Sequence, residues 1–237
     1  MIILLLNKKR NDTKYIKKLM SQYDIRIVSI TPRQSCPNPF HMAVKKTELR
    51  EKAKQYFQNM ILAAHELSCP KLLITSGWQS YSETRQEAWD RSVWMVGELC
   101  RFAEKYGVSL TMETLSRQST TLVNTISDLK QMMKEVNSKA FTITADIHTI
   151  YNAKESIQDY FDTFGKKLNH CHFMDYKNGI RSHLAWGDGE ADIKEILDIF
   201  DRNRFSGHFV LEYTDSKYFL EPFKVYEKTY HIIRQNL

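Results

Sequence analysis

Apolar and polar positions follow a repeating order along the chain, in which a short apolar run precedes a longer amphipathic stretch. The apolar runs are rich in β-branched side chains, which is typical of strands buried on both faces of a parallel sheet. They lie at residues 1–6, 25–30, 71–76, 109–115, 141–146, 168–175 and 208–213. The pattern therefore predicts about seven strands.

The stretches between these runs carry apolar residues about 3.6 positions apart, which predicts helices. They lie at residues 13–23, 48–67, 82–107, 124–136, 156–165, 192–203 and 220–236. Gly107, Gly165 and Gly207 each fall between a helix and the next strand, where glycine commonly ends a helix. No linker or low-complexity segment divides the chain, so we expect a single domain over residues 1–237.

Strands that alternate with helices indicate an α/β protein with a parallel sheet. Two architectures fit this order: a TIM (β/α)8 barrel and an open, doubly wound sheet. A doubly wound dinucleotide-binding sheet carries a GxGxxG motif after its first strand, and the segment LLNKKRND at 5–12 contains no glycine. The sequence therefore favours the TIM barrel.

Composition narrows the class of protein further. The formal net charge of +6 could attract nucleic acid or a phosphorylated substrate, but the lysines and arginines are spread along the chain. No apolar run approaches the ~20 residues of a transmembrane helix, and the apolar-then-basic start reverses the order of a secretory signal. The four cysteines form no CxxC pair, which is typical of a reducing compartment, so we expect a cytoplasmic protein.

Acidic and imidazole side chains recur where the predicted strands end, at Glu113, Asp146, His172 and Glu212. In a barrel these ends meet at one face, where catalytic groups gather. Three carboxylates at one place repel each other, and a divalent cation removes that repulsion. Oxygen and nitrogen ligands without thiolate suit Mn²⁺, Co²⁺, Mg²⁺ or Zn²⁺. Each residue alone also has an ordinary structural interpretation, as a solvated glutamate or a core histidine.

With these residues in place, the chain resembles the sugar isomerase/epimerase superfamily of xylose isomerase-like barrels. The resemblance covers about residues 24–237 and lies in LTMETLSRQSTTLVN, TADIHTIY, LNHCHFMD, SHLAWGDGEADIKEILD and FSGHFVLEYT. It implies a divalent metal ion held by Glu113, Asp146, His172 and Glu212. It also implies that Glu113 and Glu212 move protons on opposite sides of a substrate carbon. The resemblance further implies that the first βα unit of the family is missing from this chain.

The same resemblance implies that Asp175 and His183 support the metal site or contact substrate. Arg181 and Trp186 are further candidates for substrate contacts. His148 stands one residue earlier than in the family motif D-x-x-H, so both a substrate role and a local structural role remain open for it.

The resemblance implies a metal-dependent epimerase or isomerase that acts on a ketose or ketosamine through a cis-enediolate. A small sugar is then the expected partner, with no membrane contact, nucleic acid not expected and homo-oligomerisation left open. Two alternatives stay in view: an endonuclease IV-like DNA repair hydrolase, which needs three zinc ions, and an inactive truncated barrel.

Overall fold

The computed structural model describes residues 11–35 and 37–237 of the chain. The strand expected at residues 1–6 and the side chain of Cys36 lie outside these residues. The chain divides into two compact units, Met1–Ile143 and Thr144–Leu237. The single domain expected over residues 1–237 stays a prediction.

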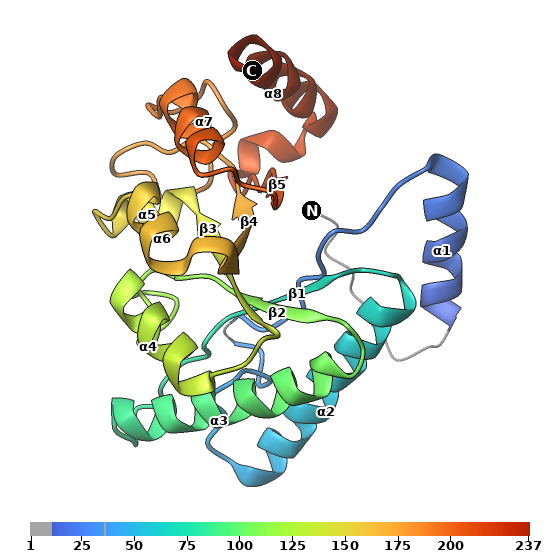
Figure 1. The fold of residues 1–237 in the computed structure, drawn as a ribbon, viewed down its shortest axis with the longest axis vertical. Coiled ribbons are helices and arrows are strands. Elements are labelled where there is room, and N and C mark those ends of the chain that lie inside the picture. The colour runs from blue at the N-terminus through green and yellow to red at the C-terminus, as the bar shows by residue number, and fades with distance from the viewer. Residues whose placement is uncertain (1–10, 36) are drawn as a thin grey trace. The chain divides into compact units, whose positions relative to one another are not determined.

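The first unit alternates helices with parallel strands, as the hydrophobic pattern predicts. Its elements are α1 (Asn11–Tyr23), α2 (Thr47–Glu66), β1 (Lys71–Ile74), α3 (Arg85–Glu104), β2 (Ser109–Met112), α4 (Ile126–Val136) and the beginning of β3 (Phe141–Asp146). β1 runs parallel to β2 with Lys71 opposite Ser109, and Leu110 of β2 stands opposite Phe141 of β3. Figure 1 shows α2 and α3 beneath β1 and β2.

Local side-chain chemistry determines where the helices of the first unit begin. Thr84 accepts a hydrogen bond from the Glu87 N–H, and the Glu87 carboxylate accepts one from the Thr84 N–H, so a reciprocal capping box starts α3. Thr125 and Asp128 make the same arrangement at the start of α4. These bonds satisfy backbone donors that would otherwise have no partner in the first turn.

The strand expected at residues 25–30 is not formed, which corrects the prediction. Only Ile30 pairs with β1: its N–H donates to the Lys71 carbonyl at 3.0 Å, and its carbonyl accepts from the Leu73 N–H at 2.8 Å. Beyond Ile30, the Gln34 side chain replaces a strand. Its amide nitrogen donates to the Leu73 carbonyl at 3.1 Å, and its oxygen accepts from the Thr75 N–H at 3.0 Å. One side-chain amide therefore makes the next hydrogen bonds to the edge of β1, where a neighbouring strand would use its backbone.

The second unit contains the end of β3 and the remaining elements. These are α5 (Ile147–Asn152), α6 (Ile157–Phe164), the 3-10 turn η1 (Gly165–Lys167), β4 (Leu168–His172), α7 (Ile193–Arg202), β5 (His208–Val210), the 3-10 turn η2 (Ser216–Phe219) and α8 (Pro222–Asn236). β4 and β5 are parallel, with His170 opposite His208 and His172 opposite Val210. Figure 1 shows α7 and α8 next to each other.

Aromatic side chains, most of them buried, form a cluster in this unit, and Phe209 at its edge is 42% exposed. Phe200 of α7 lies 5.2 Å from Phe161 of α6 and 4.8 Å from Phe209 of β5, measured between ring centroids. Phe173, which follows β4, lies 4.9 Å from the Phe209 ring. The cluster thus joins α6 and α7 to β5 and to the residue that follows β4.

Two further observations concern the whole described chain. Among residues 11–35 and 37–237, no helix combines the length and the apolar character needed to cross a lipid bilayer. Cys69, Cys100 and Cys171 are buried free thiols.

Candidate metal centre

Three of the four predicted metal ligands lie in the second unit, at or just beyond the carboxyl ends of its strands. Asp146 is the last residue of β3, and His172 is the last residue of β4. Glu212 follows β5 by two residues, because this strand ends at Val210 instead of continuing to residue 213 as predicted. A fourth residue, His183, comes from the long loop between β4 and α7.

These four side chains meet with imidazole nitrogens next to carboxylate oxygens. Nδ1 of His172 lies 3.4 Å from Oδ2 of Asp146 and 3.1 Å from Oε2 of Glu212. The His183 ring lies against the same two oxygens, with Nε2 3.7 Å from Asp146 and Nδ1 3.3 Å from Glu212. Two carboxylates and two imidazoles therefore share a space only a few ångströms across. These are the donor types and the spacing that a divalent cation uses.

Burial and charge act in opposite directions on the acids of this group. Burial alone would raise the pKa of Asp146, but the neighbouring His183 and His172 rings outweigh it and hold that pKa well below its ordinary value. Burial would also raise the pKa of Glu212, and the His172 charge together with the His183 hydrogen bond lowers it overall. Both acids therefore stay ionised at neutral pH, which is the state that binds a cation.

Asp146 has a second task that fixes its orientation. Its Oδ1 accepts a hydrogen bond from the Thr149 N–H at 2.7 Å, so the carboxylate caps the start of α5. The other oxygen, Oδ2, faces the two imidazoles. One aspartate thus joins the geometry of the cation site to the beginning of a helix.

That helix brings His148 to the same place. Asp146, His148 and His183 each offer a ligand atom within 4.8 Å of the others, and the two histidine rings lie 5.0 Å apart. Nε2 of His148 is 3.1 Å from the Ile180 carbonyl, and burial lowers the pKa of this histidine. His148 is therefore both close to the site and tied into local structure, and its predicted substrate contact stays a prediction.

Sequence reasoning missed α5 and, with it, Asn152. The amide nitrogen of Asn152 lies 3.1 Å from Nε2 and 3.3 Å from Nδ1 of His148. The signal was present: an aspartate able to cap a helix, followed by polar residues four positions apart at 148 and 152. A helix of one and a half turns is too short to show in a periodicity pattern.

The remaining predicted residues are placed as follows. Asp175 is buried, and both of its oxygens accept hydrogen bonds from backbone N–H groups of the loop that follows. Trp186 is 1% exposed and packs against Phe173 at 4.5 Å, which is a core position. Arg181 is exposed on the loop. Their substrate contacts stay predictions.

Glu113 is the remaining predicted site residue, and His170 is a neighbour of His172 on β4. Glu113 directly follows β2 in the first unit and is buried. Its predicted metal and proton-transfer roles are not tested by the geometry of the second unit. His170, two residues before His172 on β4, is fully buried, and its ring lies 5.6 Å from that of His172.

Comparisons with known proteins were made for the whole chain. Residues 5–235 match the model of the family described as xylose isomerase-like TIM barrel. Fructoselysine 3-epimerase from Shigella flexneri is 27% identical over 215 residues, which are 90% of this chain and 77% of that protein.

Solved structures give the same fold. A 3-keto-D-glucoside 4-epimerase from E. coli aligns with a TM-score of 0.81 at 14% identity, covering 95% of this chain and 85% of that one. A zinc-binding protein called IOLI aligns with a TM-score of 0.75 at 15% identity, covering 92% and 80% of the two chains.

Proposed function

This chain belongs to the xylose isomerase-like TIM barrel family, and from that premise we propose that it is a divalent-metal-dependent sugar epimerase acting on a ketose or ketosamine through a cis-enediolate. Family membership confirms the predicted α/β barrel class. Two of the proteins named above, fructoselysine 3-epimerase and 3-keto-D-glucoside 4-epimerase, are sugar epimerases, which are isomerases, in agreement with the predicted enzyme class.

The observation that carries the proposal is the alternation of imidazoles and carboxylates at the carboxyl ends of the strands. Asp146, His172 and Glu212 supply oxygen and nitrogen donors separated by 3.1 and 3.4 Å at the His172 ring. With Glu113 as the predicted fourth ligand, they would hold Mn²⁺, Co²⁺, Mg²⁺ or Zn²⁺. Such an ion, when bound, polarises a carbonyl and makes the neighbouring C–H more acidic.

The chain's own residues supply the proton transfers. Glu212 would take the proton from the substrate carbon on one side, because its pKa lies below the ordinary value and it is ionised at neutral pH. Inversion needs a second group on the opposite side, and Glu113 is the predicted one. His183, His148 and Arg181 are the proposed substrate contacts, and they would orient the hydroxyl groups and exclude other poses.

The test is proton exchange. We expect the purified protein with Mn²⁺ to incorporate deuterium from D₂O at C3 of its ketose substrate, observed by proton NMR, with fructoselysine and D-fructose as the first compounds to assay. Glu212→Gln should abolish exchange, because an amide cannot accept the proton. Glu227→Gln, an exposed carboxylate on α8, is the matched control and should keep full activity. Exchange that persists in the Glu212 variant would contradict the role of this residue.

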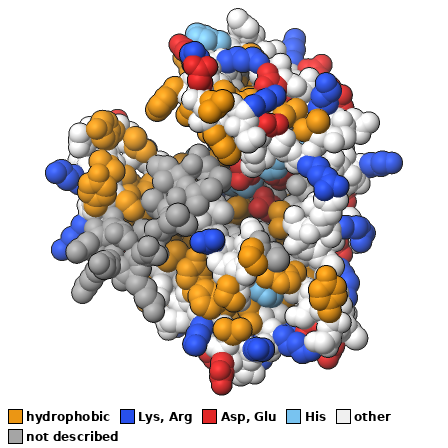
Figure 2. Space-filling model, turned by 180° about the vertical axis from the view of Figure 1, so that it is seen from behind, with side chains coloured by type: hydrophobic (Ala, Val, Ile, Leu, Met, Phe, Trp, Pro, Cys, Tyr) orange, Lys and Arg blue, Asp and Glu red, His pale blue; other side chains and the backbone are white. Residues whose placement is uncertain are grey.

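The two alternatives predict different measurements. An endonuclease IV-like enzyme would contain three metal ions per chain and cleave abasic DNA. Figure 2 shows lysine and arginine side chains spread among acidic and uncharged groups over the face it draws, which gives that alternative little support. An inactive barrel could still bind one metal ion and would show no exchange with any ketose. Metal stoichiometry and exchange, measured together, therefore separate all three.

A small sugar is the proposed partner. The cytoplasmic location and a homo-oligomeric state also stay predictions, and size-exclusion chromatography with light scattering measures the second.

A further inference from the structure

The loop between β4 and α7 is built around one buried carboxylate. Asp175 is 2% exposed, and its two oxygens accept four backbone hydrogen bonds. The donors are the N–H groups of Tyr176 (2.8 Å), Gly187 (3.0 Å), Gly189 (2.8 Å) and Ala191 (3.0 Å). Three of these donors come from 12 to 16 residues further along the chain. The carboxylate therefore binds the far end of the loop, residues 187–191, to the segment that directly follows β4.

Gly187 and Gly189, two of the three glycines of the loop, are required by this arrangement. A Cβ atom at Gly189 would stand 2.3 Å from Oδ1 of Asp175 and 2.3 Å from the Tyr176 carbonyl oxygen. Gly187 has a φ of +86°, which L-residues rarely adopt. The G-x-G spacing thus brings two N–H groups close to one carboxylate, as in the backbone concavities that bind anions.

The middle of the same loop carries His183, whose ring lies in the candidate metal centre. Asp175 and Leu184 form an antiparallel bridge, with N–H to carbonyl distances of 2.9 and 3.1 Å in the two directions. His183 directly precedes Leu184. Its N–H donates to Oγ1 of Thr214 at 2.8 Å, and its carbonyl oxygen accepts a hydrogen bond from the Thr214 N–H. His183 is thus held between the Asp175 end of the loop and the segment that carries Glu212.

We propose that Asp175 is a positioning residue, which sets the His183 ring between Asp146 and Glu212 by organising the loop around its carboxylate. This inference rests on the proposed function. Both oxygens are turned to backbone donors, so Asp175 acts through His183 and not by touching the substrate. An asparagine would keep one acceptor and point its NH₂ group at N–H donors, which leaves buried donors without a partner.

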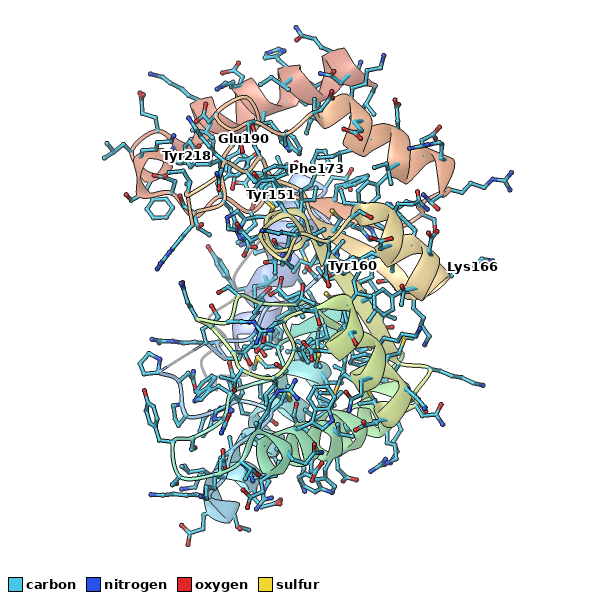
Figure 3. The ribbon with its side chains drawn as sticks, turned by 90° about the vertical axis from the view of Figure 1, so that its left-hand side faces the viewer. Tyr151, Tyr160, Lys166, Phe173, Glu190 and Tyr218 are labelled. Atoms are coloured by element: carbon cyan, nitrogen blue, oxygen red, sulfur yellow. The ribbon has the colours of Figure 1, made fainter. Side chains whose placement is uncertain are left out.

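The test compares three variants: Asp175→Asn, Asp188→Asn as the matched control, and His183→Gln. Asp188 lies in the same loop, but its carboxylate accepts from the Tyr218 hydroxyl at 2.7 Å and pairs with Lys228, on the side of α8. Figure 3 labels Glu190, which belongs to this loop, and Tyr218, which belongs to η2. The primary readout is the long-range proton–nitrogen NMR spectrum of the histidine rings, in which His183 is assigned by its loss in His183→Gln. This readout needs neither metal nor activity.

We expect Asp175→Asn to shift or broaden the His183 ring signals and Asp188→Asn to leave them in place. In the exchange assay, Asp175→Asn should lower kcat/KM by about 10-fold to 100-fold, the usual effect of losing a group that orients a site residue. In the His183→Gln background the same change should matter less than about 2-fold, since residues that act through one another are not additive.

Unchanged His183 signals in Asp175→Asn, or an equal loss of kcat/KM in both backgrounds, would overturn the proposal. If Asp175→Asn does not fold, Ala191→Pro removes one of the four donors and leaves the carboxylate intact. It should shift or broaden the His183 signals relative to the wild type, and no change counts against the proposal. If the NMR shifts occur but no ketose exchanges its proton, the positioning role stands and the proposed function fails.

Discussion

Stability of this protein should fall at mildly acidic pH because of His41. This histidine is 8% exposed in the first unit, and its ring stacks on Trp78 at 3.7 Å. Nδ1 accepts a hydrogen bond from the Ala43 N–H at 3.3 Å, which requires the neutral ring at that nitrogen. Burial, aided by the nearby charge of Arg91 and opposed by Glu83, lowers its pKa from 6.5 to about 4.

The direction of the effect follows from proton binding. Between pH 6.5 and pH 4 the unfolded chain protonates His41 and the folded chain does not, so the unfolded state is stabilised relative to the folded state as the pH falls. With these two pKa values, the free energy of unfolding falls by about 2 kcal/mol between pH 7 and pH 5 because of this one residue. Above pH 7 the contribution is nearly constant.

Urea unfolding at pH 7 and at pH 5 measures this effect when the wild type is compared with His41→Gln. Glutamine retains an acceptor oxygen and does not titrate, so the pH dependence of all other groups cancels in the difference. We expect the stability advantage of the wild type over the variant to shrink by about 2 kcal/mol at pH 5. An advantage that stays the same at the two pH values would refute the reasoning, and so would an NMR pKa of His41 near 6.5 in the folded protein.

Two other outcomes are expected. Gly189→Ala places a Cβ 2.3 Å from the Asp175 carboxylate and should cost about 1–3 kcal/mol in urea unfolding. Gly97→Ala, a helix position with only the end of Arg101 at 3.6 Å, should instead be neutral or stabilise by up to about 1 kcal/mol. Adding Mn²⁺ at about 100 times its Kd should stabilise the wild type by about 2.7 kcal/mol, and Glu212→Gln should lose most of that gain. Equal stabilisation of both proteins would mean that the ion binds elsewhere.

Hydrophobic patterning predicted the elements that bury apolar side chains on regular faces. The run at 141–146 became β3 with the predicted bounds, since every residue of it is buried. Patterning failed where a side chain, and not the backbone, makes the hydrogen bonds to a strand. The apolar run at 25–30 reads as a strand, yet the Gln34 amide supplies the next hydrogen bonds to β1. Such a substitution leaves no periodic signal.

The candidate site divides in the same way. Asp146 and His172 could be found because they end apolar runs, where parallel strands expose their last side chains. The sequence also singled out His183 and Asp175, but the pattern itself carried no information on what each one contacts. Asp175 is bonded to residues 12 to 16 positions away inside one loop, and His183 is bonded to Thr214 outside it; no spacing rule describes these hydrogen bonds.

The Asp175–Leu184 bridge divides the loop into an exposed part and a part that is hydrogen-bonded to its surroundings. Residues 177–181 project beyond the bridge and are exposed. After the bridge, Gly187, Gly189 and Ala191 donate to the Asp175 carboxylate, and Asp188 pairs with Lys228 of α8. Residues could be inserted or exchanged in the projecting part without altering the distance from the bridge to His183. Evolution, or a library of loop variants, therefore has a place where substrate preference can be changed while the cation ligands keep their positions.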